Sequence, residues 1–132
     1  MSTPGNLPVA VIGGGPIGLA AAAHLVTRGV PVKLYEAGET VAAHVRSWGH
    51  VRLFSPWRHN TDTAARAILR DRGWQEPPAG ALPTGGDLYA AYLQPLAQTP
   101  ATEARERISG PPALHKTWCT TAARNLSREN RT

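Results

Sequence analysis

The sequence predicts an α/β fold that begins with two parallel strands. Three observations support this prediction. A short apolar run at residues 9–12 ends in three glycines, an alanine-rich segment follows the glycines, and a second apolar run at residues 32–35 ends in an acidic residue. A strand, a helix and a strand within about 30 residues form one βαβ unit, whose crossover is right-handed.

Each element of this unit has its own signal. The run Val-Ala-Val-Ile at 9–12 is continuously apolar, as is typical of a strand buried on both faces of a parallel sheet. Residues 17–27 are rich in Ala and Leu, and Arg28-Gly29 after them is a helix C-terminal signal. Residues 32–35 predict the second strand, with Glu36 at its end.

The second half is predicted to be mainly helical. Residues 51–54 form either a short strand or a loop with two packed apolar side chains. Asp62 has the position and chemistry of an N-cap for a helix over residues 64–71, and Gly73 lies near its C-cap. Residues 76–86 contain three prolines and three glycines, which predicts a loop.

A further helix is predicted after this loop. Thr84 with Asp87 three residues later resembles a capping box. Three apolar residues then recur at a spacing of four and define one helix face: Leu88, Tyr92 and Leu96. Pro95 lies within that segment, so we expect the helix to kink or end there.

Residues 1–108 are expected to form a partial domain, and residues 109–132 an irregular tail. A third strand of the sheet is expected to begin near Ile108. However, the Ser-Gly-Pro-Pro run at 109–112 follows, and prolines cannot donate hydrogen bonds to a central strand. Thr, Arg and Asn dominate the segment after residue 117, without strand alternation or a helical stripe.

The glycines after the first strand form a phosphate-binding motif. Residues 13–18 read GGGPIG, which fits G-x-G-x-x-G. Gly13 allows a tight turn, Gly15 lets a pyrophosphate approach the backbone, and Gly18 lets helix and strand pack closely. Pro16 suits the first helical turn, and Ile17 follows it in the turn whose amides and dipole face the phosphates. The motif predicts a Rossmann-type dinucleotide-binding domain.

Glu36 restricts the choice of nucleotide. It comes 18 residues after Gly18, where an acid at the end of the second strand accepts hydrogen bonds from both adenosine ribose hydroxyls. A 2′-phosphate would meet the carboxylate there, which disfavours NADP. NAD and FAD both have a free 2′-hydroxyl, so both fit these residues.

The stretch VAVIGGGPIGLAAAAHLVTRGVPVKLYEAG resembles the N-terminal FAD-binding segment of two-dinucleotide-binding flavoproteins, which include flavin-dependent monooxygenases and pyridine-nucleotide-dependent oxidoreductases. HVRSWGHVRLFSPWRHNTD also resembles a bacterial subgroup of FAD-dependent oxidoreductases, and together the likeness covers residues 8–98.

The resemblance implies FAD as the cofactor and NAD(P)H as the electron donor of a full-length relative. It places the FAD pyrophosphate on the motif glycines and the adenosine ribose on Glu36. It also places Arg46 near the flavin and pyrophosphate, where the cation offsets phosphate charge. Family members often have a Gly-Gly pair just before this point, where this chain has Ala42-Ala43.

Two features of the family are missing from the 132 residues: a second glycine motif for the nicotinamide nucleotide, and an apolar strand ending in Ala-Thr-Gly. We therefore expect a truncated FAD-binding segment without its own NAD(P)H site, activity or catalytic residue. The alternatives are a non-catalytic nucleotide-binding module, which includes an inactive truncated product, and a fragment of an NAD-binding dehydrogenase.

Composition excludes several other classes. Fourteen Lys and Arg against nine Asp and Glu give a net charge of +5, but they form no basic cluster, which argues against nucleic acid as a partner. No apolar stretch is long enough to span a membrane. A single cysteine, Cys119, excludes an internal disulfide and a cysteine zinc cage. With no basic residue before the first apolar run, a secretory signal is not expected, and we expect a cytoplasmic protein.

Overall fold

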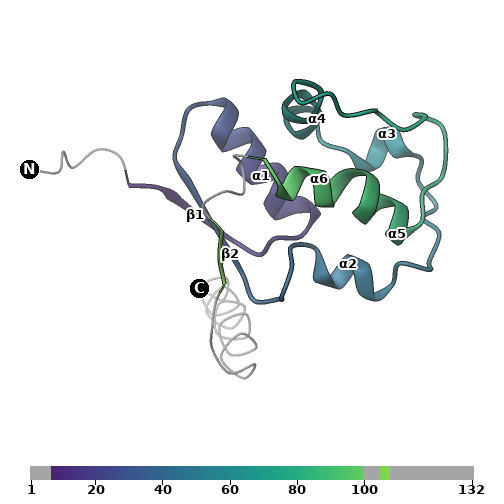
Figure 1. Cartoon of the computed structure of the whole chain (residues 1–132), viewed down its shortest axis with the longest axis horizontal. Helices are drawn as coiled ribbons and strands as arrows, with labels where there is room; N and C mark the ends of the chain where they lie inside the picture. The colour runs from purple at the N-terminus through teal and green to yellow at the C-terminus, as the bar shows by residue number, and fades with distance from the viewer. Residues whose placement is uncertain (1–6, 100–104, 108–132) are drawn as a thin grey trace, which may run out of the picture.

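The structure is a computed structural model that describes residues 7–99 and 105–107. Its elements confirm the predicted α/β class with a Rossmann-type start. In chain order they are β1 (Val9–Ile12), α1 (Pro16–Thr27), β2 (Val32–Glu36), α2 (Ala43–Ser47), α3 (Trp57–Asn60), α4 (Thr63–Arg70), α5 (Gly85–Leu88), the π-helical turn η1 (Tyr89–Leu93), α6 (Gln94–Ala97) and β3 (Arg105–Arg107). Figure 1 shows that α2 to α6 gather on the side away from the N-terminus.

The sheet is parallel and has the order β1-β2-β3 in the described part of the chain. Val9 pairs with Val32 and Val11 with Leu34, while Leu34 pairs with Arg105 on its other side. A middle second strand is the arrangement found in one half of a doubly wound sheet. The predicted parallel pair of strands is therefore confirmed, but the prediction that the first strand is buried on both faces is wrong, since Val9 is 42 % and Ile12 67 % exposed.

The third strand lies before the position considered in the sequence. A third strand would begin near Ile108, where the prolines that follow predict that no central strand forms, whereas β3 lies at residues 105–107. Its sequence, Arg-Glu-Arg, has no apolar pattern, so periodicity could not reveal it. Backbone pairing with the edge of β2 defines this strand instead. The Ser-Gly-Pro-Pro run, the domain boundary at 108 and the tail at 109–132 lie outside the described residues.

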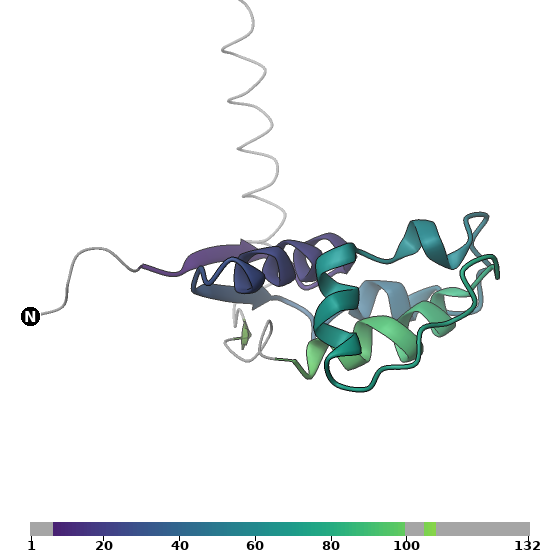
Figure 2. The same cartoon turned by 90° about the horizontal axis from the view of Figure 1, so that it is seen from above.

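Helix α1 connects the sheet to the helical half, because it contacts β1, β2 and α4. Figure 2 shows α1 beside the strands, with the other helices beyond its end. Its small side chains Ala22 and Ala23 are fully buried, as are Leu19 of α1 and Leu34 of β2. Close packing of this alanine-rich helix fixes where its first turn lies relative to the ends of the strands.

The segment at 85–97 confirms two sequence predictions. The Thr84 hydroxyl accepts the Asp87 N–H at 3.0 Å, and the Asp87 carboxylate accepts the Thr84 N–H at 2.9 Å, so the capping box is present. The predicted apolar face is buried: Leu88, Tyr92 and Leu96. Residues 51–54 form a loop with one bridge between Arg52 and Thr84, as one of the two alternatives predicted. The two packed apolar side chains expected of that loop are not both present, because Leu53 packs against the core whereas Phe54 is 99 % exposed.

Pro95 alters this helix by widening it rather than ending it. The π-helical turn η1 immediately precedes Gln94, and α6 continues to Ala97. In an α-helix the N–H of residue 95 would bond the Ala91 carbonyl, and proline has no N–H. The indole N–H of Trp74 donates to that carbonyl at 2.6 Å instead. A side chain from 17 residues earlier in the chain thus donates to the carbonyl that Pro95 has no N–H to reach.

We expect Trp74→Phe to lower the free energy of unfolding by about 1–3 kcal/mol, because the Ala91 carbonyl loses its donor. Pro95→Ala restores a backbone donor for the same carbonyl, so the loss should be smaller in that background. Urea unfolding of the two single variants and the double variant measures the coupling. Equal losses in both backgrounds would show that the indole contributes packing alone.

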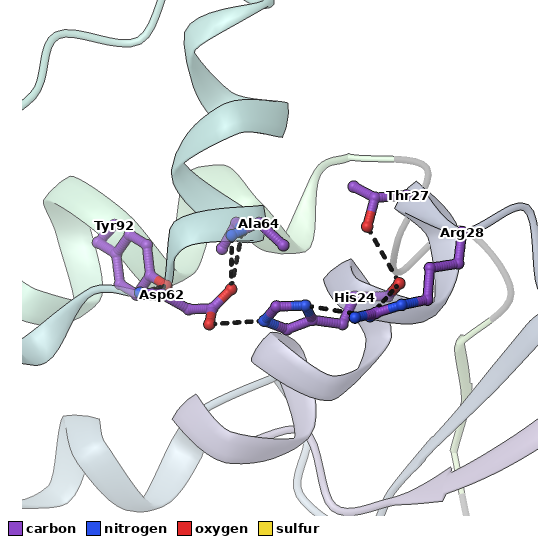
Figure 3. Close-up of polar contacts among 7 residues, drawn as sticks. His24, Thr27, Arg28, Asp62, Ala64 and Tyr92 are labelled. Carbon is purple, nitrogen blue, oxygen red and sulfur yellow. Dashed lines mark hydrogen bonds and ion pairs between the residues drawn. The ribbon is translucent and has the colours of Figure 1, made fainter.

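The N-terminus of α4 is capped as predicted. One oxygen of Asp62 accepts the N–H groups of Ala64 at 2.9 Å and Ala65 at 3.0 Å. The other oxygen meets Nε2 of His24 at 2.9 Å, which joins α4 to α1 (Figure 3). The Asp62 N–H also donates to the Tyr92 hydroxyl at 3.0 Å. Burial raises the pKa of Asp62, but the hydrogen bonds from Ala65 and His24 outweigh it, and the pKa lies below its ordinary value.

Replacement of Asp62 should separate the cap from the contact with His24. Asp62→Ala is expected to cost about 1–2 kcal/mol of stability, whereas Asp62→Asn retains a good cap and should cost less. Because the folded-state pKa is lowered, the carboxylate stabilises the fold above its unfolded pKa, and this contribution is lost as pH falls through the folded pKa. Urea unfolding at neutral pH and at a series of acidic pH values should therefore show the wild type and Asp62→Asn converging as Asp62 takes up its proton. A constant difference would contradict this.

Candidate functional site: the glycine loop and Glu36

The chain turns sharply at the end of β1. Gly13 has a φ of +100°, in the left-handed region that favours glycine. Its N–H still donates to the Tyr35 carbonyl at 2.7 Å, so the loop begins firmly attached to β2. The turn directs the next residues across the carboxyl end of the sheet and into α1.

Gly18 lies where the loop and α1 approach most closely. A Cβ atom built on Gly18 would be 1.8 Å from the carbonyl oxygen of Gly13 and 3.5 Å from a methyl group of Val11. No side chain fits there. Only glycine allows the first turn of α1 to pack this closely against the loop and β1.

Gly15 has the opposite environment. It is the N-cap of α1 with φ −80° and ψ −173°, and a Cβ built on it would have no atom within 4 Å. No side chain caps this helix end, although Pro16 follows in its first turn. Ile17 is 84 % exposed. The backbone at Gly15 therefore borders open space, and the N–H groups of the first turn are available to an anion.

Glu36 lies against the glycine loop. Its carboxylate accepts the N–H of Gly14 at 2.6 Å and the N–H of Gly38 at 2.7 Å. The predicted residues of the loop and the acid are thus brought together at one end of the sheet. Gly14 was missed as a site residue, although it is the middle glycine of the GGG run and is buried.

The alanines at 42 and 43 replace the family's glycine pair without preventing the turn. Ala42 has a φ of +52°, a left-handed conformation uncommon for a residue with a side chain. Its N–H donates to the Gly14 carbonyl at 2.9 Å, so it fastens the loop after β2 to the glycine loop.

Arg46 lies in α2 and stacks on an aromatic ring. Its guanidinium is 5.1 Å from the ring centroid of Tyr89, a cation–π distance. It lines a shallow hollow of about 340 Å³ with Glu39, Thr40, Ala43 and Ser47. The contact that the structure gives Arg46 is therefore with Tyr89 rather than with the glycine loop.

A second hollow, of about 440 Å³, opens beside the first turn of α1. Its lining joins both halves of the molecule: Pro16, Ile17, Ala20, Trp48, Leu53, His59, Asn60, Thr61, Asp62, Leu88 and Tyr92. Because Pro16 and Ile17 belong to the glycine loop and also line the hollow, the hollow continues directly from that loop. Trp48 lines the hollow, whereas Trp57 is buried in the core.

Two other kinds of site are absent from the described part of the chain. Residues 7–99 and 105–107 contain no group of three or more His, Cys, Asp or Glu side chains able to hold a metal ion. Among the same residues no helix is both long and apolar enough to cross a membrane.

Comparison with known proteins agrees with this geometry. The family model described as FAD dependent oxidoreductase matches residues 8–129. Neither the curated proteins nor the solved structures gave a significant match. Since the family model covers most of the 132 residues, the chain belongs to the family of FAD-dependent oxidoreductases.

Proposed function

We propose that this chain is the FAD-binding segment of an NAD(P)H-dependent flavin oxidoreductase or monooxygenase and that it holds FAD by its ADP half. In this proposal the pyrophosphate lies on the loop at 13–18 and the adenosine ribose lies against Glu36. The observation that supports it best is the open space at Gly15, at an uncapped helix N-terminus and one residue after the Gly14 N–H that Glu36 accepts.

The residues present suit the two ends of an ADP group. The free N–H groups and positive dipole end of α1 attract a pyrophosphate, and Gly15 has no side chain to obstruct it. Glu36 offers acceptors to ribose hydroxyls and repels a 2′-phosphate. Arg46 remains a candidate for offsetting phosphate charge.

The hollow beside Ile17 suits the flavin half of the same molecule. Its walls are mostly apolar, with Trp48 and Leu53 contributing, and Asn60 and Thr61 add polar groups to the lining. A planar aromatic ring with polar atoms along its rim matches such a lining. Bound FAD would supply the electron-transfer chemistry, while these residues bind and orient it and exclude water.

NAD is the second candidate, because the glycine loop and Glu36 suit any dinucleotide with a free 2′-hydroxyl. Identifying the bound nucleotide decides between FAD and NAD. It can be analysed in the purified protein, or in protein dialysed against equal concentrations of FAD and NAD. We expect the visible absorbance of oxidised flavin in the nucleotide released by heat. Release of NAD alone would overturn the proposal in favour of a dehydrogenase fragment.

We also expect the 132-residue chain not to oxidise NADH or NADPH, even with added FAD. The reason is that its sequence contains one glycine motif, at residues 13–18, and no second one for the nicotinamide nucleotide. Loss of the nicotinamide absorbance over time measures this. Steady oxidation that depends on FAD and disappears in a Gly15→Val variant would contradict it.

A further inference from the structure

The carboxylate of Glu36 is bonded on both oxygens to the backbone. Oε2 accepts the N–H of Gly14 in the loop after β1, and Oε1 accepts the N–H of Gly38 in the loop after β2. The distances of 2.6 and 2.7 Å are short, as is usual for hydrogen bonds to a charged group. One side chain therefore joins the two loops that border the proposed nucleotide site.

The surroundings of the carboxylate leave little freedom to either loop. A Cβ built on Gly14 would be 2.9 Å from Oε2 of Glu36, and one built on Gly38 would be 3.2 Å from Oε1. The Gly14 carbonyl in turn accepts the Ala42 N–H at 2.9 Å. Gly14 is thus bonded through both of its backbone polar groups, and both of its partners lie at or after the end of β2.

We propose that Glu36 is a positioning residue that holds the glycine loop in its binding geometry before the nucleotide arrives. Two N–H donors converge on this side chain, so both of its terminal atoms must accept. A carboxylate does so, whereas glutamine accepts at one atom and turns its NH₂ group toward the other donor. An acid is therefore required here even without a ribose.

This role rests on the proposed function and deepens it. Each carboxylate oxygen has a second lone pair, so ribose hydroxyls can bind oxygens that are already fixed in place. A loop that is ordered in advance loses less conformational freedom on binding, which favours affinity for the pyrophosphate as well as for the ribose. Glu36 would then act on the whole ADP group.

Amide hydrogen exchange of the nucleotide-free protein tests the positioning role directly. Because glutamine keeps one acceptor atom, we expect exchange in Glu36→Gln to rise about tenfold or more at one of the two amides, Gly14 or Gly38. Exchange at Val9, whose N–H bonds the Pro31 carbonyl at 2.8 Å, should stay unchanged and report an intact sheet. Asp71→Asn is the control, since it removes a carboxylate charge at an exposed position after α4, away from both loops, and should alter neither amide.

Titration with ADP gives the binding result for the same proteins. We expect Glu36→Gln to weaken ADP binding about tenfold or more and Asp71→Asn to leave it unchanged. Unchanged exchange at Gly14 and Gly38 in Glu36→Gln would overturn the positioning role. If that variant does not fold, unprotected Gly14 and Gly38 amides in the nucleotide-free wild type would overturn it equally. Protected amides in a wild type that does not bind ADP would instead overturn the proposed function alone.

Discussion

Replacing Gly15 with valine is expected to abolish FAD binding and leave the fold intact. The backbone at Gly15 has φ −80° and ψ −173°, which a β-branched residue adopts without strain, and its Cβ would meet no protein atom within 4 Å. The side chain would instead fill the space proposed for the pyrophosphate. We expect affinity to fall by at least about a hundredfold, or about 2.7 kcal/mol. Flavin fluorescence titration and urea unfolding measure the two effects separately.

Gly80→Val is the matched control for this variant. A Cβ at Gly80 would have only the end of the Arg58 side chain nearby, at 3.9 Å, so the same substitution is made at a position with room for it. It should leave both FAD affinity and stability unchanged. Unchanged FAD affinity in Gly15→Val would mean that the pyrophosphate does not lie on this loop.

The second large effect is expected at Gly18, where even alanine should prevent stable folding. The added Cβ would lie 1.8 Å from the Gly13 carbonyl oxygen and 3.0 Å from its carbon, and both are backbone atoms that cannot rotate away. Overpacking of this kind costs about 3 kcal/mol or more, a large part of the stability of a small domain. Circular dichroism and urea unfolding measure the loss.

Whether Gly18→Ala lowers or raises stability is informative, because helix propensity alone predicts that it raises stability. Glycine within a helix is about 1 kcal/mol less favourable than alanine, so Gly18→Ala would stabilise α1 if nothing lay nearby. Ala21→Gly, at an exposed position of the same helix, measures that propensity term. Stability of Gly18→Ala equal to or above the wild type would show that α1 and the loop pack less closely than described.

Much of the fold could be predicted because its signals are local. The apolar run at 9–12, the glycine motif and Glu36 lie within 28 residues and define the βαβ unit together. Asp62 and the Thr84-Asp87 pair each cap a helix through residues two or three positions away. Such short-range patterns depend little on the rest of the molecule.

The features that escaped prediction depend on contacts between distant segments. Strand β3 at 105–107 pairs with β2 through its backbone, which no side-chain pattern reveals. Pro95 indicated a disrupted helix, but the indole of Trp74 that satisfies the Ala91 carbonyl comes from another segment. The hydrogen bond from Gly14 to Glu36 likewise spans 22 residues. The contact of Glu36 with the glycine loop therefore became visible only in three dimensions.

The central claim is that the chain holds FAD by its ADP half, and competition in equilibrium dialysis tests it most directly. The nucleotide-free protein would be dialysed against FAD, with ADP or FMN added as the competitor. The proposed site predicts that the chain retains FAD, that ADP displaces it and that FMN, which lacks the ADP half, does not. No retention of FAD, or displacement by FMN but not by ADP, would contradict the assignment of the glycine loop and Glu36 as the nucleotide site.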